Sequence, residues 1–137
     1  MSSQDNVEVV KQAYQNFKTG DIESLLNLLS EDVTWRLPEI ENVPYSGTRE
    51  GREAVAGFFS SLADTQETVQ FEPREFVASN DKVVVLGAYT WRVKANGREF
   101  GGDWAHVFTV RDGKIQGFQE YMDTAAATLA HQKATAA

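Results

Sequence analysis

The chain has 137 residues, of which 42% are hydrophobic and 24% charged, and its formal net charge is −7. This length supports one domain with one core, and the acidic balance argues against a nucleic-acid partner and against an anionic membrane surface. The absence of cysteine excludes disulfides, thiolate catalysis and zinc–thiolate sites. We expect one domain over 1–137, with an ordered core over about 5–130 and a tail over 131–137 that frays.

The sequence shows neither a membrane segment nor a secretory leader. No apolar run approaches the ~20 residues that a bilayer span requires. The first residues also lack a basic start followed by an apolar run. We therefore expect a cytoplasmic protein with no membrane partner.

The first part of the chain predicts two helices. Ser2 or Ser3 can cap the first helix, and Gly20 ends it. Asp21 can cap the second helix. Their core sides are apolar residues at helical spacing in the first helix and a run of leucines in the second. These two sets are Val7, Val10, Tyr14 and Phe17, and Leu25, Leu26, Leu28 and Leu29.

A short strand, a loop and a third helix come next. Val33, Trp35 and Leu37 alternate with polar residues, as in a strand, and Pro38 stops the pattern. The segment 38–50 has the prolines and glycine that are typical of a loop. The third helix carries its apolar residues at helical spacing, and these are Val55, Phe58, Phe59 and Leu62.

Strands dominate the rest of the chain. A strand near 68–78 contains Pro73, which indicates an edge strand or a bulge. Three further strands are expected over roughly 82–95, 98–111 and 114–122. Asp123 can then cap a last, short helix. Helices first and strands later indicate an α+β fold, in which helices against a strongly curved sheet would form a cone with a mouth.

Two turns determine which side chains face each other in this sheet. Asn96-Gly97 is a strong signal for a two-residue hairpin loop. That loop would place Tyr89 directly across from Trp104. It would also place Gly102 opposite Trp91 and Gly87 opposite His106, and we expect these gaps to leave Trp91 and Trp104 at the mouth of a pocket.

The second turn allows two registers. A type I turn with a bulge at Gly113 would place Glu120 beside Trp104, whereas a two-residue Asp112-Gly113 loop would shift the pairing by one and move Glu120 to the other face. We prefer the bulged turn because it gives one apolar set a shared side. That set is Phe108, Val110, Phe118 and Met122.

With these registers, the two faces of the sheet differ in character. One face holds an acid and an imidazole in an aromatic wall, as a small-molecule site would. Its members are Tyr89, Trp91, Trp104, His106, Phe118, Glu120 and Met122. The opposite face mixes polar residues with Ala105, Val107, Ile115 and Tyr121, so we expect a homodimer through it.

Several segments resemble a known superfamily. They are Thr19-Gly20-Asp21, Val33-Thr34-Trp35-Arg36-Leu37-Pro38, Tyr45-Ser46-Gly47 leading to Gly51-Arg52-Glu53-Ala54-Val55, and the stretch from His106 to Ile115. In these, the chain resembles the nuclear-transport-factor-2-like superfamily, in its SnoaL-like and ketosteroid-isomerase-related branch, from about Val7 to Leu129. The resemblance implies a single SnoaL-like domain with a cone-shaped α+β barrel. Three N-terminal helices would pack on a strongly curved mixed or antiparallel sheet, followed by a short C-terminal helix.

The resemblance argues against steroid isomerisation. Steroid isomerases of this branch use an aspartate base before the proline that ends the first strand, and that place is Leu37 here. They use a first-helix tyrosine whose place is Ala13, while Tyr14 is expected to point elsewhere on the helix. Their second oxyanion donor corresponds to His106.

Other activities of the branch carry over only in part. Limonene-epoxide-hydrolase-like members use an aspartate–arginine–aspartate trio, of which Gly87 and Tyr89 occupy two places and only Glu120 keeps a carboxylate. SnoaL-like cyclases place an acid and histidines in the same cone, which Glu120 and His106 approximate. Because this fold hosts isomerases, cyclases, dehydratases, epoxide hydrolases and non-enzymes, the resemblance implies no single activity.

The candidate catalytic residues are Glu120, His106 and Tyr89. Glu120 would move a proton, with His106 and Tyr89 as its hydrogen-bond partners. The competing interpretation is a structural Glu–His pair that holds the sheet together. The side chains expected to bind the substrate are Trp35, Leu37, Phe58, Trp91, Trp104, Phe118 and Met122. His131 is expected to lie in the fraying tail, without a role.

The sequence predicts a cofactor-independent acid–base enzyme that binds a small apolar or aromatic molecule bearing oxygen. The reaction would be an isomerisation, cyclisation, dehydration or addition of water. We expect no metal, because His106 with Glu120 supplies only two ligands, and no cofactor. One alternative is a non-catalytic ligand-binding or carrier domain, and another is a protein-interaction domain that buries the outer sheet face.

Overall fold

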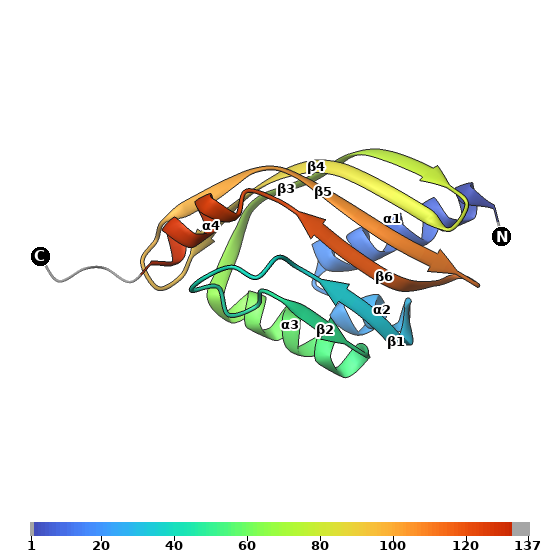
Figure 1. Cartoon of the computed structure of the whole chain (residues 1–137), viewed down its shortest axis with the longest axis horizontal. Helices are drawn as coiled ribbons and strands as arrows, with labels where there is room; N and C mark the ends of the chain where they lie inside the picture. Colours follow the sequence, from blue (N-terminus) through green and yellow to red (C-terminus); the bar gives the residue numbers. More distant parts are fainter. Residues whose placement is uncertain (1, 133–137) are drawn as a thin grey trace, which may run out of the picture.

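The computed structural model describes residues 2–132, which form helices and one six-stranded curved sheet (Figure 1). The helices are α1 (Ser3–Thr19), α2 (Ile22–Asn27), α3 (Arg52–Thr65) and α4 (Thr124–His131). The strands are β1 (Leu29–Arg36), β2 (Thr48–Glu50), β3 (Gln66–Ser79), β4 (Lys82–Val93), β5 (Glu99–Arg111) and β6 (Lys114–Tyr121). The predicted α+β class is confirmed.

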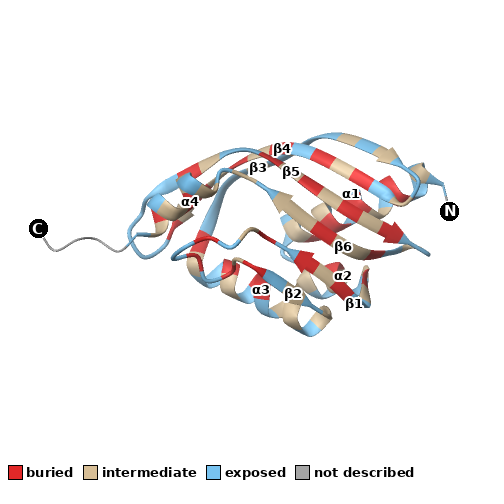
Figure 2. Ribbon diagram, viewed as in Figure 1, coloured by how far each residue is buried: buried red, intermediate tan, exposed pale blue. Residues whose placement is uncertain are grey.

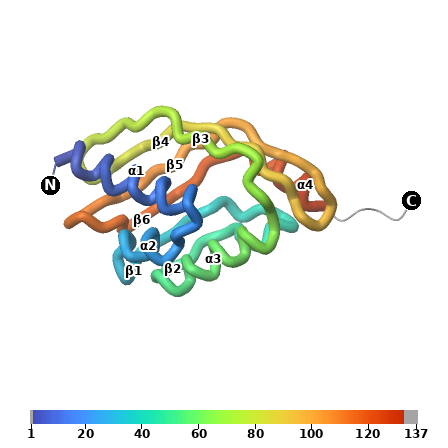
Figure 3. The backbone as a smooth tube through the Cα atoms, turned by 180° about the vertical axis from the view of Figure 1, so that it is seen from behind, coloured from blue at the N-terminus to red at the C-terminus, as the bar shows by residue number. Residues whose placement is uncertain are grey.

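The sheet is mixed and open. Its strand order is β2-β1-β6-β5-β4-β3, with β1 parallel to β6 and all other neighbours antiparallel. The helices α1, α2 and α3 lie on its concave side, and α1 runs beneath the arch of β3 (Figure 3). None of the helices within 2–132 is long and apolar enough to cross a bilayer.

The helix ends lie where the capping residues predict them. Ser2 forms a reciprocal capping box with Asp5 at the start of α1, and Gly20 ends the helix with a φ of 78°. Asp21 caps α2 and Asp123 caps α4, each by accepting a backbone N–H. Local side-chain chemistry therefore determines these boundaries.

The first strand is longer than predicted, and β2 was missed. β1 begins at Leu29, which is fully buried and pairs with Ile115 of β6. Polar residues interrupt the alternation between Leu29 and Val33, so the sequence pattern shows only the second half of the strand. β2 lies in the predicted 38–50 loop and pairs with β1 over only three residues, too few for a periodic signal.

The third strand has the features that its proline predicts. β3 is an edge strand, and its pairing with β4 is irregular between Pro73 and Glu75. A proline cannot donate to a ladder, so it is tolerated at an edge or at a bulge, and here it lies at both.

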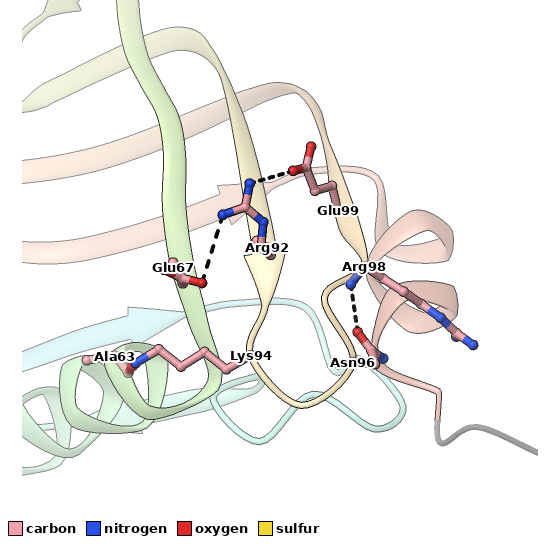
Figure 4. A network of polar contacts seen from close by, with 7 residues as sticks. All are labelled: Ala63, Glu67, Arg92, Lys94, Asn96, Arg98 and Glu99. Atoms are coloured by element: carbon pink, nitrogen blue, oxygen red, sulfur yellow. Dashed lines mark hydrogen bonds and ion pairs between the residues drawn. The ribbon is translucent and has the colours of Figure 1, made fainter.

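The β4–β5 hairpin has a longer loop than predicted. Val93 N donates to Arg98 O at 2.8 Å, so the loop contains four residues instead of two. A two-residue type I′ loop needs a positive φ at both central residues, but only Gly97 has one. Asn96 instead accepts the backbone N–H of Arg98 at 2.9 Å (Figure 4) and donates to Ala130 O of α4.

This loop changes the cross-strand partners but not the faces. Tyr89 pairs with Gly102, and Trp104 pairs with Gly87, so the predicted Tyr89–Trp104 pair is wrong by two residues. A shift of two keeps every side chain on its predicted face. Buried and more exposed residues accordingly alternate along β4 and β5 (Figure 2).

The β5–β6 turn is a two-residue loop, so the predicted bulged turn at Gly113 is wrong. Asp112 and Gly113 both have positive φ, and Arg111 pairs with Lys114. Taken alone, this turn would move Glu120 to the outer face.

A bulge inside the strands reverses that change. Val110 pairs with Ile115 but Thr109 pairs with Gly117, which leaves Gln116 as an extra residue. Glu120 therefore reaches the concave face, opposite His106 and not opposite Trp104. Ile115, expected on the outer face, is fully buried on the concave side.

Candidate functional site

A cavity of about 70 Å³ lies between the helices and the concave face of the sheet. Aromatic and aliphatic side chains form most of its wall, and Glu120 and His106 are in it. The predicted site residues on this wall are Trp35, Leu37, Phe58, Tyr89, Trp91, His106, Phe118 and Glu120. The arrangement is that of a small-molecule site, apolar with a few polar groups.

A chain of hydrogen bonds joins four side chains from four elements. Tyr89 of β4 donates to Glu120 Oε1 of β6 at 2.9 Å. The other carboxylate oxygen of Glu120 lies 2.9 Å from Nε2 of His106, on β5. On the far side of that imidazole, Nδ1 lies 2.7 Å from the hydroxyl of Tyr14 on α1.

The protons of this chain point toward the carboxylate. Burial, helped by the negative charge of Glu120, raises the pKa of Tyr14 and of Tyr89 well above the ordinary value, so both phenols remain donors. If Tyr14 donates to Nδ1, a neutral imidazole carries its proton on Nε2 and donates to Glu120. The carboxylate then accepts two hydrogen bonds, one on each oxygen.

The imidazole and the carboxylate are largely removed from water. The side chain of His106 is 5% exposed and that of Glu120 is 12% exposed. His106 stacks on Trp104, with 3.9 Å between ring centroids, and Phe118 contacts its edge at 4.7 Å. Hydrogen bonds in such apolar surroundings are stronger than in water.

Two residues expected to bind the substrate are not on the cavity wall. The indole of Trp104 lies over Gly87, where an added Cβ would collide with it and with the carbonyl of Glu72. The expected gap at the mouth is therefore filled by Trp104 itself. Met122 lies after β6 and packs, half-buried, against the core.

Tyr14 contributes a hydroxyl that the sequence analysis assigned elsewhere. Its expected orientation away from the site is wrong, because the hydroxyl bonds to His106. The signal was present, since Tyr14 belongs to the apolar stripe of α1 that faces the core. Ala13 also lies on the cavity wall, so both positions of the helix face the site.

Tyr45 and Gln66 form a second polar pair on the wall that the sequence did not reveal. The Tyr45 hydroxyl donates to Gln66 Oε1 at 2.8 Å. Tyr45 comes from the segment between β1 and β2, and Gln66 is the first residue of β3. Neither belongs to a periodic pattern, so only the folded chain brings them together.

Two other expectations from the sequence concern metal ligands and the position of His131. Within 2–132, no group of three histidine, aspartate or glutamate side chains could hold a metal ion. The expectation that His131 lies in a fraying tail is wrong, because it is the last residue of α4 and its ring packs against Phe100 at 5.2 Å and Tyr45 at 6.1 Å. Of the tail expected over 131–137, residues 133–137 lie outside the described residues.

Comparisons with known proteins find relatives of this chain by sequence and by structure. The sequence profile of the SnoaL-like domain matches residues 10–118. An NTF2-like protein from Burkholderia xenovorans LB400 is 38% identical, with a TM-score of 0.87 and coverage of 96% of this chain and 99% of that chain. An NTF2-like protein from Burkholderia pseudomallei K96243 is 27% identical, with a TM-score of 0.87 and coverage of 97% and 100%.

A third similar structure is that of a protein co-crystallised with a ligand. TerC co-crystallised with polyporic acid is 29% identical, with a TM-score of 0.83 and coverage of 93% of this chain and 98% of that chain. Among curated proteins, none matches this sequence.

Proposed function

This chain belongs to the SnoaL-like domain family, and from its cavity we propose a cofactor-independent acid–base enzyme of the isomerase, cyclase, dehydratase or hydratase type. Its substrate is a small apolar or aromatic molecule that bears oxygen. The observation that carries the proposal is the Glu120 carboxylate, held by two hydrogen bonds in an otherwise apolar wall. A positioned carboxylate of this kind is suited to proton transfer.

The Glu120 carboxylate can still accept a proton from a substrate. Each of its oxygens has two lone pairs, and the bonds from Tyr89 and His106 use one on each. Isomerisation, cyclisation and dehydration can each begin with a step in which a proton leaves a carbon next to a carbonyl group, and addition of water runs this step in reverse. That proton passes to Glu120, while the electron pair of the C–H bond passes to the carbonyl oxygen and gives an enolate. Return of the proton at another atom regenerates the carboxylate.

The remaining members of the chain have positioning roles. His106 and Tyr89 fix the two oxygens of Glu120, and Tyr14 fixes the imidazole from behind. The co-crystallisation of TerC with polyporic acid supports an organic ligand for this fold at 29% identity.

The experiment begins with mass spectrometry of small molecules retained by the native protein, followed by turnover of whatever is found. In parallel, NMR follows deuterium exchange from D2O into the methyl group of 2-acetylnaphthalene, a simple aromatic ketone. Glu120→Gln should lower the protein-dependent rate by ~10²–10⁴-fold, because an amide cannot take the proton. Glu75→Gln, at an exposed glutamate of β3, is the matched control and should leave the rate unchanged.

Equal rates for Glu120→Gln and the wild type would contradict the proposal. A retained molecule that binds through this cavity without any Glu120-dependent reaction would instead identify a ligand-binding or carrier domain.

A further inference from the structure

The cavity beside Glu120 is too small for an organic ligand by itself. Its volume is about 70 Å³, whereas an engineered cavity that binds benzene has about 150 Å³. An open groove of about 940 Å³ lies next to it, between α1, α3 and β3. A ligand that reaches Glu120 must therefore displace the wall between the two spaces and extend into the groove.

Shared residues identify that wall. The residues that line both the cavity and the groove are Tyr14, Phe17, Phe59, Leu62, Gln66, Phe71 and Trp91. The wall is thus mostly aromatic, with one leucine and one amide in it. It stands where α1 and the end of α3 meet the first half of β3 (Figure 3).

The amide of Gln66 has a hydrogen-bond donor with no partner among residues 2–132. The residue is 4% exposed, and its Nε2 is buried without a hydrogen bond. Its Oε1 accepts the Tyr45 hydroxyl at 2.8 Å. Burial raises the pKa of Tyr45, so that hydroxyl keeps its proton and needs an acceptor. This orientation of the amide satisfies Tyr45 and leaves the N–H groups of Gln66 free.

We propose that the side-chain amide of Gln66 binds a carbonyl oxygen of the ligand where the ligand passes from the cavity into the groove. This inference rests on the proposed function for the position of the ligand at Glu120. A buried donor without a partner is unfavourable in the free protein, and a ligand oxygen would satisfy it. Ligands that lack that oxygen leave the donor unpaired, so they bind less tightly.

The charges of the cavity select neutral carbonyl groups. Among the described residues on its wall, Glu120 is the one acidic side chain and no lysine or arginine is present. A carboxylate group inside the cavity would therefore meet a like charge without a compensating cation on the cavity wall. The part of the ligand inside the cavity is therefore a neutral ketone, ester or quinone with an aromatic or apolar body.

The test compares two probes of the same shape by equilibrium dialysis. 2-Acetylnaphthalene carries a carbonyl oxygen, and 2-isopropenylnaphthalene carries a CH2 group in its place. The wild-type protein should bind the ketone about tenfold more tightly, the difference that one hydrogen bond makes. Tyr45→Phe is the matched control, because it keeps the amide and should keep this preference.

Two variants remove the donor. Tyr45→Phe combined with Gln66→Met removes the amide without leaving a lone hydroxyl, and Gln66→Glu keeps the acceptor for Tyr45 but replaces the N–H groups. Both should bind the two probes equally while retaining affinity for the hydrocarbon, which also shows that they are folded. A preference that persists in both variants, or one absent from the wild type, overturns the inference.

The outcome is separable from that of the proposed function. If the Gln66 variants lose the preference for the ketone but no Glu120-dependent deuterium exchange is found, the Gln66 subsite is supported and the proposed catalysis is not. If the exchange depends on Glu120 but the Gln66 variants keep the preference, the catalysis is supported and the Gln66 subsite is not.

Discussion

The imidazole of His106 has a partner on each ring nitrogen, Tyr14 on one side and Glu120 on the other. Trp104 covers one face of the ring, Phe118 packs against it at 4.7 Å, and the side chain is only 5% exposed, so water cannot readily replace a lost partner. At the scale of single residues, the site is therefore sensitive to the removal of one hydroxyl.

Tyr14→Phe removes the donor to His106 Nδ1 and leaves that nitrogen buried without a partner. The free energy of unfolding should fall by ~1–3 kcal/mol, the range for an unsatisfied buried polar group. Urea denaturation measures this change. Tyr121→Phe is the control: it keeps the ring on the outer sheet face and removes only the hydroxyl of a side chain that is 54% exposed in one chain, so it should change the free energy of unfolding by less than ~0.5 kcal/mol. Equal effects of the two substitutions would contradict the role given to Tyr14.

Three tyrosines, two of them buried and Tyr14 partly buried, also predict a loss of stability in alkali. Burial raises the pKa of Tyr14, Tyr45 and Tyr89 in the folded protein. In the unfolded chain they release their protons near pH ~10, while the folded protein keeps them, so the unfolded state binds fewer protons. The stability contribution is complete below pH ~10 and falls above it, by up to ~1.4 kcal/mol per phenol per pH unit.

Urea denaturation between pH 8 and 11 tests this dependence. The decline above pH ~10 should be less steep in Tyr14→Phe than in the wild type, because one of the three phenols is gone. Tyr121→Phe should show the wild-type slope. A decline of the same steepness in all three proteins would refute the assignment.

At the scale of elements, the β5–β6 hairpin determines where Glu120 lies. The two-residue turn and the bulge at Gln116 each change the register by one residue, and only together do they bring Glu120 to the concave face. The sequence signals for turns were strong, but Gln116 carries no mark of a bulge. That is why the face was predicted correctly and the cross-strand partner was not.

Deletion of Gln116 should remove the bulge and keep the register beyond it, because Gly117 would still pair with Thr109. Phe118 should stay stacked on Trp35, with 4.0 Å between ring centroids, so the free energy of unfolding should change by much less than the ~3–5 kcal/mol that the loss of a core phenylalanine costs. Insertion of an alanine between Gly117 and Phe118 should have that larger effect, because it moves Phe118 to the outer face. Circular dichroism during thermal unfolding measures both variants. A deletion as destabilising as the insertion would show that the bulge does not set the register.

The elements that the sequence predicts well are those with local signals. Helix ends follow from Ser2, Gly20, Asp21 and Asp123, whose side chains or φ angles act within a few residues. Contacts such as Tyr45 with Gln66 depend on the packing of distant segments and leave no local pattern. Even-numbered register errors preserved the faces, so the wall of the site was predicted better than its pairings.

At the scale of the whole molecule, the outer sheet face has an apolar row across three strands. Leu86 pairs with Ala105, which pairs with Tyr121, and Leu86 and Tyr121 are 40% and 54% exposed. We propose that this row is the centre of a homodimer, since closed two-fold dimers are the commonest assembly.

Light scattering at micromolar concentration should therefore give twice the chain mass of 15.3 kDa. Leu86→Glu should give the monomer mass, because it places a charge in the centre of the interface. Leu129→Glu, at an exposed leucine on α4, is the control and should leave the dimer intact. A monomer mass for the wild-type protein would contradict the proposed dimer.

The single negative charge on the cavity wall has a consequence for inhibitors. When a ketone loses its proton to Glu120, the charge moves to the enolate and the total in the cavity stays the same. An anionic inhibitor that mimics the enolate gives the same total charge in the cavity only if Glu120 is protonated in the complex. Its binding should then take up one proton from the buffer, whereas a neutral ketone should take up none. Titration calorimetry in buffers of different ionisation enthalpy measures that proton directly, and a zero value for the anion would mean that the carboxylate keeps its charge beside the ligand.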